Sequence, residues 1–201
     1  MKKRLQLLAW VLSLAMLCQM LPFAAFAETD LSTNATDTAT TEKSIPDDAI
    51  QFNGNHYKFY GIQDVTSNST ATWEAASQFC QNKGGHLAVI CSQEENDFLF
   101  QQMKSLGYNN ALFGFSDKEV EGTWKWVNGT QSSYTNWHYG EPNHQGSYEH
   151  YAMFYEKYTD GTWNDGSGII DRNCVFICEW DDSSLVASGV CGDNLTWSLS
   201  S

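Results

Sequence analysis

Apolar positions recur at helical spacing in the first half of the chain. Between Trp73 and Cys80 they fall on one face, and Thr72 can cap the N-terminus of this segment. A second helical segment starts with the capping-box pair Ser92 and Glu95. The pattern therefore predicts two helices, and it predicts no convincing helix after them.

Short apolar and aromatic runs predict strands around these helices. The runs cover residues 57–60, 86–90, 113–115, 124–127 and 175–180. Before the last run lies a polar stretch, 134–168, which we expect to be a long loop region. Long loops in compact domains are usually functional. Two helices followed by strands and a long loop predict an α+β domain.

The N-terminus has the pattern of an export signal. Basic residues 2–4 precede an apolar run, 7–18, and an Ala-x-Ala site ends at residue 27. The run is shorter than the roughly 20 residues that a membrane-spanning helix needs, and no second apolar run follows. We therefore expect residues 1–27 to be a cleaved signal peptide. No membrane span is expected, and the location is secreted, extracellular or at the cell surface.

Two further segments differ in composition from the expected domain. Residues 28–48 are rich in Thr, Ser and Asp, which is typical of a disordered linker. Residues 183–201 are mostly small and polar, and they form either a flexible tail or the truncated start of a further secreted module. The domain itself is expected to span residues 49–182.

The charge of the chain excludes one class of partner. Lys and Arg number 11 and Asp and Glu number 24, giving a net charge of −13. A nucleic-acid binder needs a basic surface, so nucleic acid is not an expected partner. The excess of carboxylates is compatible with binding a cation.

Oxygen-bearing side chains gather in and around the polar stretch. They are Glu141, Asn143, Glu149, Asn164 and Asp165. Three carboxylates and two amides suit Ca²⁺, which takes about six to eight oxygen ligands in flexible geometry, better than Mg²⁺. If the bond before Pro142 is cis, the turn can point both flanking side chains at one ion. Acidic loops are often merely solvated, so Glu141-Pro142-Asn143 or Trp163-Asn164-Asp165 alone would be weak evidence.

Taken in order, the motifs of residues 50–182 resemble those of a C-type lectin domain, in what looks like a bacterial secreted member. The matching segments are Trp73 with Ala76 and Cys80, then 84–88, 94–96, 114–117, 122–126, 136–137, 141–143, 163–165 and 176–179. The resemblance implies an α+β double-loop domain with two helices, small antiparallel sheets and a long calcium-binding loop. Its terminal strands would pair with each other.

The resemblance also implies a function. The principal Ca²⁺ site of the family falls on Glu141, Asn143, Glu149, Asn164 and Asp165, and the same five residues would bind sugar. In this family two neighbouring sugar hydroxyls replace water on the ion, and Glu-Pro-Asn is associated with mannose-type sugars. These are mannose, fucose, N-acetylglucosamine and glucose. The implied partners are glycans or glycoconjugates, and we expect the chain to be one part of a larger surface protein.

One pair of cysteines has an implied partner, whereas the pairing of the others is undecided. The resemblance implies a disulfide between Cys80 and Cys178, whereas the second disulfide of the family has no counterpart here. Cys91 and Cys174 lie at the ends of two expected strands. They form either a replacement disulfide or two buried thiols. The pairing of Cys191 stays open.

An accessory calcium site of some family members would use Asp117, Glu121 and Glu149. Its fourth acidic position holds His144 in this chain, which counts against occupation by calcium. In the polar stretch, Tyr139 and Tyr148 are the best candidates for contact with a sugar ring.

An enzyme is not expected. The chain has no Gly-x-Ser-x-Gly or Cys–His signature, and metal binding explains Glu141 and Glu149 better than a glycosidase pair does. The main alternative is a C-type lectin-like scaffold for protein–protein interaction or a structural role, in which calcium only orders the loop.

Overall fold

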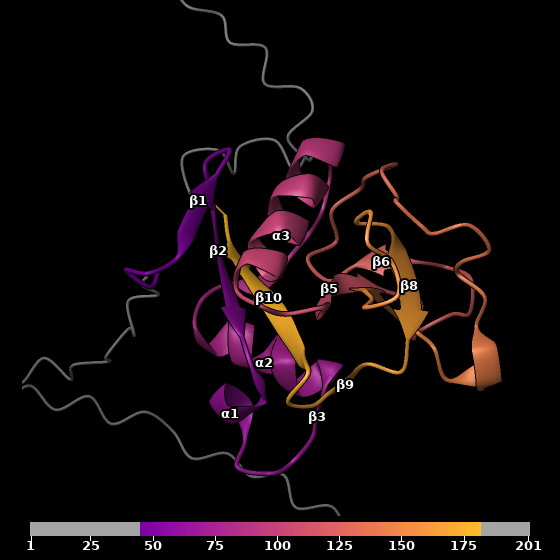
Figure 1. Cartoon of the computed structure of the whole chain (residues 1–201), viewed down its shortest axis with the longest axis horizontal. Coiled ribbons are helices and arrows are strands. Elements are labelled where there is room, and N and C mark those ends of the chain that lie inside the picture. The colour runs from indigo at the N-terminus through magenta and orange to yellow at the C-terminus, as the bar shows by residue number, and fades with distance from the viewer. Residues whose placement is uncertain (1–44, 182–201) are drawn as a thin grey trace, which may run out of the picture. The chain divides into compact units, whose positions relative to one another are not determined.

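The structure describes residues 45–181, which form a mixed α+β fold, shown as a computed structural model in Figure 1. Its helices are α1 (Ile62–Val65), α2 (Trp73–Asn82) and α3 (Gln93–Ser105), with a 3-10 turn, η1 (Gln145–Ser147). Its strands are β1 (Ile50–Phe52), β2 (Asn55–Tyr60), β3 (Ala71–Thr72), β4 (His86–Leu87), β5 (Asn110–Ser116), β6 (Lys125–Trp126), β7 (Tyr151–Phe154), β8 (Trp163–Gly166), β9 (Ile169–Ile170) and β10 (Cys174–Trp180). Among the described helices, none is both long and apolar enough to cross a membrane.

The two long helices begin at the residues that the sequence predicts, because a side chain caps each of them. Thr72 Oγ1 accepts the N–H of Ala75 at 3.3 Å at the start of α2. At the start of α3, Ser92 Oγ accepts the N–H of Glu95 at 3.2 Å. The Glu95 carboxylate turns into the core, where its Oε2 accepts the N–H of Cys91 at 2.8 Å.

Strand β10 lies at the centre of the main sheet, whose order is β1-β2-β10-β5-β7-β8. β2 runs antiparallel along β10, while the first half of β10 pairs in parallel with β5 and the second half pairs with β4. All seven residues of β10 are buried, which explains its nearly continuous apolar sequence. The pairing of His56 with Trp180 sets the start of β2 beside the end of β10, as expected from the sequence.

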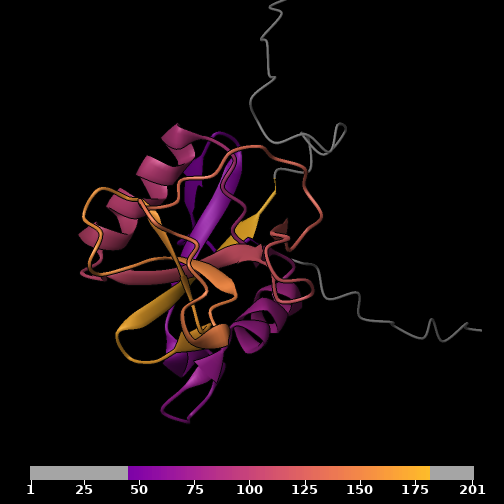
Figure 2. The ribbon, with the colours of Figure 1, turned by 90° about the vertical axis from the view of Figure 1, so that its right-hand side faces the viewer.

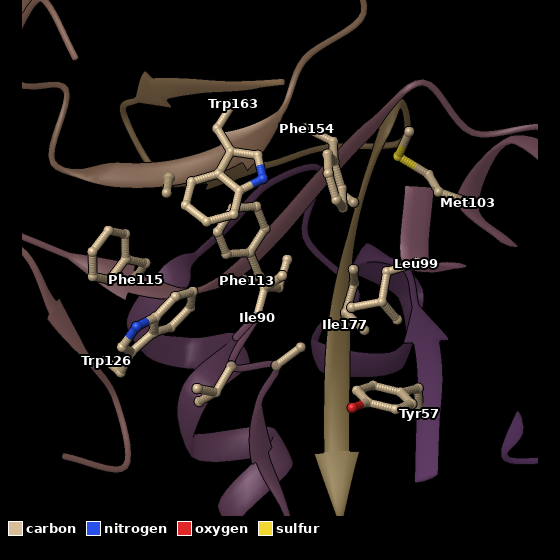
Figure 3. Close-up of a cluster of buried hydrophobic side chains, with 14 of the residues drawn as sticks. Tyr57, Ile90, Leu99, Met103, Phe113, Phe115, Trp126, Phe154, Trp163 and Ile177 are labelled. Atoms are coloured by element: carbon tan, nitrogen blue, oxygen red, sulfur yellow. The ribbon is translucent and has the colours of Figure 1, made fainter. Parts of the chain in front are cut away.

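The two long helices pack on different parts of the core, with strands between them (Figures 1 and 2). Helix α3 buries Leu99 and Met103 in an aromatic cluster, which Figure 3 shows in close-up. Helix α2 buries Ala76 and Cys80 in a second cluster. In the first cluster the ring of Phe113 lies 5.0 Å from that of Trp163, so the aromatic core reaches strand β8.

The polar stretch 134–168 is not one continuous loop, because it contains η1, β7 and β8. Strands β7 and β8 pair antiparallel over four residues each. The sequence of β8, Trp-Asn-Asp-Gly, has one apolar residue, so periodicity does not reveal a strand whose conformation depends on pairing with β7. The strand expected at 86–90 is shorter than expected, since β4 ends at Leu87 although residues 88–90 stay buried.

The disulfide between Cys80 and Cys178 is confirmed, with its two Cα atoms 5.6 Å apart. It joins helix α2 to strand β10 across a sequence separation of 98. The first of the two long helices and the last strand are thereby cross-linked, as the family resemblance implies.

Cys91 and Cys174 do not form the replacement disulfide that was one of the two possibilities, because Cys174 is a free, buried thiol. The two residues are buried in different clusters, Cys91 with the aromatic residues under α3 and Cys174 with those around α2. Burial raises the pKa of Cys174 to about 12, so its thiol is inert. Cys91 is itself disulfide-bonded, and its partner is none of the other cysteines that the structure describes.

Two carboxylates meet inside the domain. The hydroxyl of Tyr57 lies 2.5 Å from Glu95 Oε1 and 3.2 Å from Glu179 Oε1, and Glu179 Oε2 accepts the N–H of Val89 at 2.7 Å. Burial, reinforced by the charge of Glu95, raises the pKa of Glu179 to about 8. Burial alone would lower the pKa of neighbouring His86, but its hydrogen bond to Asp181 and the charge of Glu179 raise it to about 9.

The free energy of unfolding is expected to fall as pH rises between about 5 and 9. Glu179 has a higher pKa in the folded chain, about 8, than its ordinary 4.5, so stability falls as pH rises through that interval. The protonated His86 stabilises the fold fully below pH 6.5, and this stabilisation is lost as pH rises through about 9. Urea denaturation at several pH values, with chelator present, measures the slope. Glu179→Gln should flatten it below pH 8, and stability that increases over this range would contradict the assignment.

Candidate functional site

The five candidate calcium ligands come from three segments that strands β7 and β8 bring together. Glu141 and Asn143 lie in the loop before η1, Glu149 lies just before β7, and Asn164 and Asp165 lie within β8. In the β7–β8 register, Ala152 pairs with Asp165 and Met153 pairs with Asn164. Beyond the end of this pairing the N–H of His150 still donates to Gly166 O, at 2.9 Å. Glu149 is therefore held next to β8.

Asp165 holds the loop of Glu141 and Asn143 against strand β8. Its side chain is fully buried, and its two carboxylate oxygens accept the N–H of Asn143 at 3.2 Å and the N–H of His144 at 2.7 Å. The Glu141–Pro142 bond is cis, which is the arrangement considered from the sequence. A strand carboxylate thus fixes the backbone on which two further candidate ligands stand.

The side chains of Glu141 and Asn143 contact each other, and Tyr158 contacts Glu141 as well. Asn143 Nδ2 donates to Glu141 Oε2 at 2.5 Å, and the hydroxyl of Tyr158 donates to Glu141 Oε1 at 2.7 Å and lies 3.3 Å from Asn164 Oδ1. Tyr158 stacks on His138 with ring centroids 3.7 Å apart. Sequence reasoning missed Tyr158, because a tyrosine in a polar stretch without a motif carries no distinguishing signal.

The carboxylates of this cluster repel one another. Burial is the main cause that raises the pKa of Glu141, and the nearby Asp165 and Glu149 carboxylates add to it, against the hydrogen bond from Tyr158. Burial also raises the pKa of Glu149, with Asp165 contributing, although Glu149 Oε2 accepts the N–H of Gln145 at 2.8 Å. A cation among these groups would relieve both the repulsion and the cost of burial.

A pocket of about 290 Å³ opens over the cluster. Among its lining residues are Glu141, Asn143, Glu149 and Asn164, together with Tyr158. Asp165 is not in the lining, because its carboxylate faces the amides of the loop. Carboxylate and amide oxygens from separate segments are the donor set that Ca²⁺ prefers, so the residues present fit this ion. This volume lies just below the range of small-molecule sites, which begins at about 300 Å³.

Asp117 and Glu121 contact two histidines. His150 Nδ1 lies 3.1 Å from Asp117 Oδ1, and His144 Nδ1 lies 2.9 Å from Glu121 Oε2. The positions considered for an accessory calcium site therefore carry imidazole nitrogens among their carboxylates. Calcium selects oxygen ligands, so this group is chemically distinct from the five-oxygen cluster.

Trp163 connects the aromatic core to the candidate ligands that follow it in β8. Its side chain is fully buried, and its indole N–H donates to Asn96 Oδ1 at 2.6 Å. Its backbone N–H donates to Asn136 O at 2.8 Å, and its carbonyl accepts the N–H of His138 at 2.9 Å. Packing and hydrogen bonds together fix the start of β8, and hence the position of Asn164.

Replacing Trp163 with phenylalanine is expected to lower the free energy of unfolding by about 1–3 kcal/mol. Phenylalanine keeps most of the apolar ring but has no N–H, so the fully buried Asn96 loses its donor. Urea denaturation measures the loss. Trp124→Phe is the matched control, because Trp124 is only partly buried. Equal losses in the two variants would contradict a role for the buried hydrogen bond.

The fold and the cluster agree with the result of a family comparison. The model of the lectin C-type domain matches residues 69–180, more than half of the chain. The chain therefore belongs to the C-type lectin domain family. Membership of this family also supports the expectation that the chain is not an enzyme.

Curated relatives come from mammals and from a bird. The asialoglycoprotein receptor 2 of Rattus norvegicus is 36% identical over 123 residues, which cover 58% of this chain and 36% of the relative. The human C-type lectin domain family 10 member A is 38% identical over 120 residues, covering 56% of this chain and 35% of the relative. The chain thus spans about a third of the length of these relatives. Their animal origin gives no support to the bacterial source expected from the sequence.

Solved structures show the same fold over the described domain. The cow carbohydrate-recognition domain of CD23, crystallised with a GlcNAc2Man3 oligosaccharide, has a TM-score of 0.56 at 28% identity and covers 68% of this chain and 95% of that one. The carbohydrate-recognition domain of the human scavenger receptor C-type lectin has a TM-score of 0.55 at 31% identity, covering 69% and 99%. The α+β C-type lectin-like fold is thereby confirmed.

Proposed function

We propose that this chain is a Ca²⁺-dependent carbohydrate-binding module with a preference for mannose-type sugars. The observation that carries the proposal is the gathering of four candidate ligands around one pocket, with Asp165 fixing the loop beneath them. A relative named for asialoglycoprotein and a similar structure determined in the presence of an oligosaccharide support a glycan as the ligand.

The side chains of the pocket supply both partners that a pair of sugar hydroxyls needs. Carboxylate oxygens of Glu141 and Glu149 accept hydrogen bonds, and the amides of Asn143 and Asn164 donate them. A bound Ca²⁺ would supply a Lewis acid for two neighbouring hydroxyl oxygens. Tyr139 and Tyr148 are 98% and 60% exposed, so both are available for contact with a sugar ring. One such site predicts weak binding, about millimolar, which several copies together would strengthen.

Glycan-array binding of the full chain, with calcium and again with a chelator, tests this function. Calcium-dependent binding to mannose, fucose, N-acetylglucosamine or glucose is the expected result. Absence of glycan binding, with calcium still raising the melting temperature, would refute the lectin function and leave the protein-interaction scaffold as the better explanation.

The order of acceptor and donor around the pocket is expected to set sugar preference. Exchanging them with the double substitution Glu141→Gln and Asn143→Asp should move binding from mannose-type towards galactose-type sugars, because the hydroxyl pair must match that order. Competition with free monosaccharides measures the preference. The control is Glu156→Gln, an exposed position in the same stretch that is not among the pocket residues. An unchanged preference in the double variant would contradict this role.

The chain's wider organisation is part of the same proposal. Residues 1–27 act as a signal peptide, 28–48 as a linker and 49–182 as the lectin domain, while residues 183–201 are a tail or the start of another module. The first 44 residues and those after 181 lie outside the part that the structure describes. N-terminal sequencing of the exported protein tests the cleavage site, and the secreted or cell-surface location with it.

A further inference from the structure

A second group of ligand-type side chains lies beside the five-oxygen cluster without sharing a residue with it. Glu121, His144 and His150 place their ligand atoms within 4.8 Å of one another. Glu121 Oε2 lies 2.9 Å from His144 Nδ1 and 3.6 Å from His150 Nδ1, and the two imidazole rings are 4.8 Å apart between centroids. One carboxylate oxygen therefore faces two imidazole nitrogens.

The backbone holds this group in place from three segments. The N–H of Asp117, just after β5, donates to His150 O at 3.2 Å. The buried carboxylate of Asp117 accepts the N–H of Gly122 at 2.8 Å, which fixes the turn that carries Glu121. The N–H of His144 donates to Asp165. The group is thus positioned by the fold.

Hydrogen bonding within the group leaves the imidazoles with competing acceptors. His144 Nδ1 lies within 3.2 Å of both Glu121 Oε2 and the carbonyl of Glu149. His150 Nδ1 lies 3.1 Å from Asp117 Oδ1 and 3.6 Å from Glu121 Oε2. A single N–H at each position cannot satisfy both acceptors well, whereas a cation would interact favourably with all of these oxygens.

The spacing and the donor types select a borderline transition-metal ion. Ligands at the usual Zn–N and Zn–O distances of about 2.0–2.2 Å around a tetrahedral ion are separated by about 3.3–3.6 Å. Between the proposed ligands, His150 Nδ1 lies 3.6 Å from Glu121 Oε2, at the upper end of this range, and His144 Nδ1 lies 2.9 Å from it, somewhat closer. All three ligand atoms lie within 4.8 Å of one another. Imidazole suits zinc and disfavours calcium.

We propose that Glu121, His144 and His150 form a Zn²⁺ site, with water in the fourth position and the Asp117 carboxylate beside His150. The site is separate from the proposed calcium site, because none of its three ligands belongs to the five-oxygen set. It shares a segment with that set, since His144 follows Asn143 and His150 follows Glu149. Zinc would therefore tie both ends of the 143–150 segment to the turn at Glu121.

Titration of the untagged full chain with Zn²⁺, in saturating calcium, tests this inference by isothermal calorimetry. One Zn²⁺ per chain is expected, with binding weakened at least tenfold in Glu121→Gln and in His150→Gln. Glu119→Gln is the matched control, because Glu119 is exposed and paired with Lys125 at 2.8 Å. His56→Gln is the histidine control, on strand β2. Both controls should bind zinc as the unchanged chain does.

Co²⁺ in place of Zn²⁺ gives a second readout, because tetrahedral coordination produces intense visible absorption bands that octahedral coordination does not. These bands should appear in the unchanged chain and be lost in His150→Gln. Zinc binding that calcium displaces one for one would place the metal in the five-oxygen cluster and overturn the inference. So would equal zinc affinity in the unchanged chain, Glu121→Gln and His150→Gln. Neither result bears on whether the chain binds glycans with calcium.

Discussion

Asp165→Asn is expected to weaken calcium binding at least tenfold and to abolish calcium-dependent glycan binding at calcium concentrations that saturate the unchanged chain. The substitution removes one negative charge from the donor set. It also leaves one acceptor where the carboxylate has two, so the N–H of Asn143 or that of His144 loses its partner. The loop that carries Glu141 would then lose its fixed position against β8. Calorimetric titration with calcium measures the first effect, and glycan-array binding measures the second.

Asp171→Asn serves as the matched control for this experiment. Asp171 lies in the turn between β9 and β10, is not among the pocket residues, and accepts the N–H of Asn173 at 2.8 Å, which asparagine can also do. Calcium affinity should be unchanged in this variant. If Asp165→Asn also kept its calcium affinity, Asp165 would have only a structural role and the proposed ligand set would be wrong.

Removing the Cys80–Cys178 disulfide with two alanines is expected to lower the free energy of unfolding by about 4–5 kcal/mol. The cross-link closes a loop with a sequence separation of 98, so its loss releases a large part of the unfolded chain's conformational freedom. Because domains of this size are stable by only about 5–15 kcal/mol, the variant would be marginal. Urea denaturation with chelator measures the change.

Calcium should restore part of that stability, because a ligand that binds only the folded state stabilises it by mass action. The control is Cys174→Ala, which removes a free buried thiol and should cost far less. A loss below about 1 kcal/mol in the double variant would contradict the loop-entropy explanation.

The predictable parts of the fold are those that depend on neighbours in sequence. Thr72 and Ser92 act as caps through residues three positions away, so both long helices begin where local pattern places them. Strand β8 is different, because Asn164 and Asp165 are extended through pairing with β7 and buried beside an aromatic core. The buried position of the Glu95 carboxylate is also not predictable from local sequence, since its partner Tyr57 comes from a distant strand.

The candidate site divides in the same way. The residue types and their order along the chain are visible in the sequence, and the structure brings Glu141, Asn143, Glu149 and Asn164 to one pocket. That His144 and His150 face the same carboxylate is not visible, because Glu121 comes from a turn more than twenty residues earlier. The possible disulfide between Cys91 and Cys174 does not form, because the strand ends that carry these cysteines are buried in different clusters.

The disulfide also determines how the domain would respond to a mechanical load. The start of β2 and the end of β10 lie side by side, so tension applied at the two ends of the domain would separate this strand pair from one end, a few hydrogen bonds at a time. The covalent path then runs through residues up to Cys80, crosses to Cys178 and leaves the domain. Every candidate ligand, from Glu141 to Asp165, lies in the segment that this path bypasses. Under such a load the domain would lengthen only in the residues before Cys80 and after Cys178, while the segment between them, which holds the pocket, carried no tension.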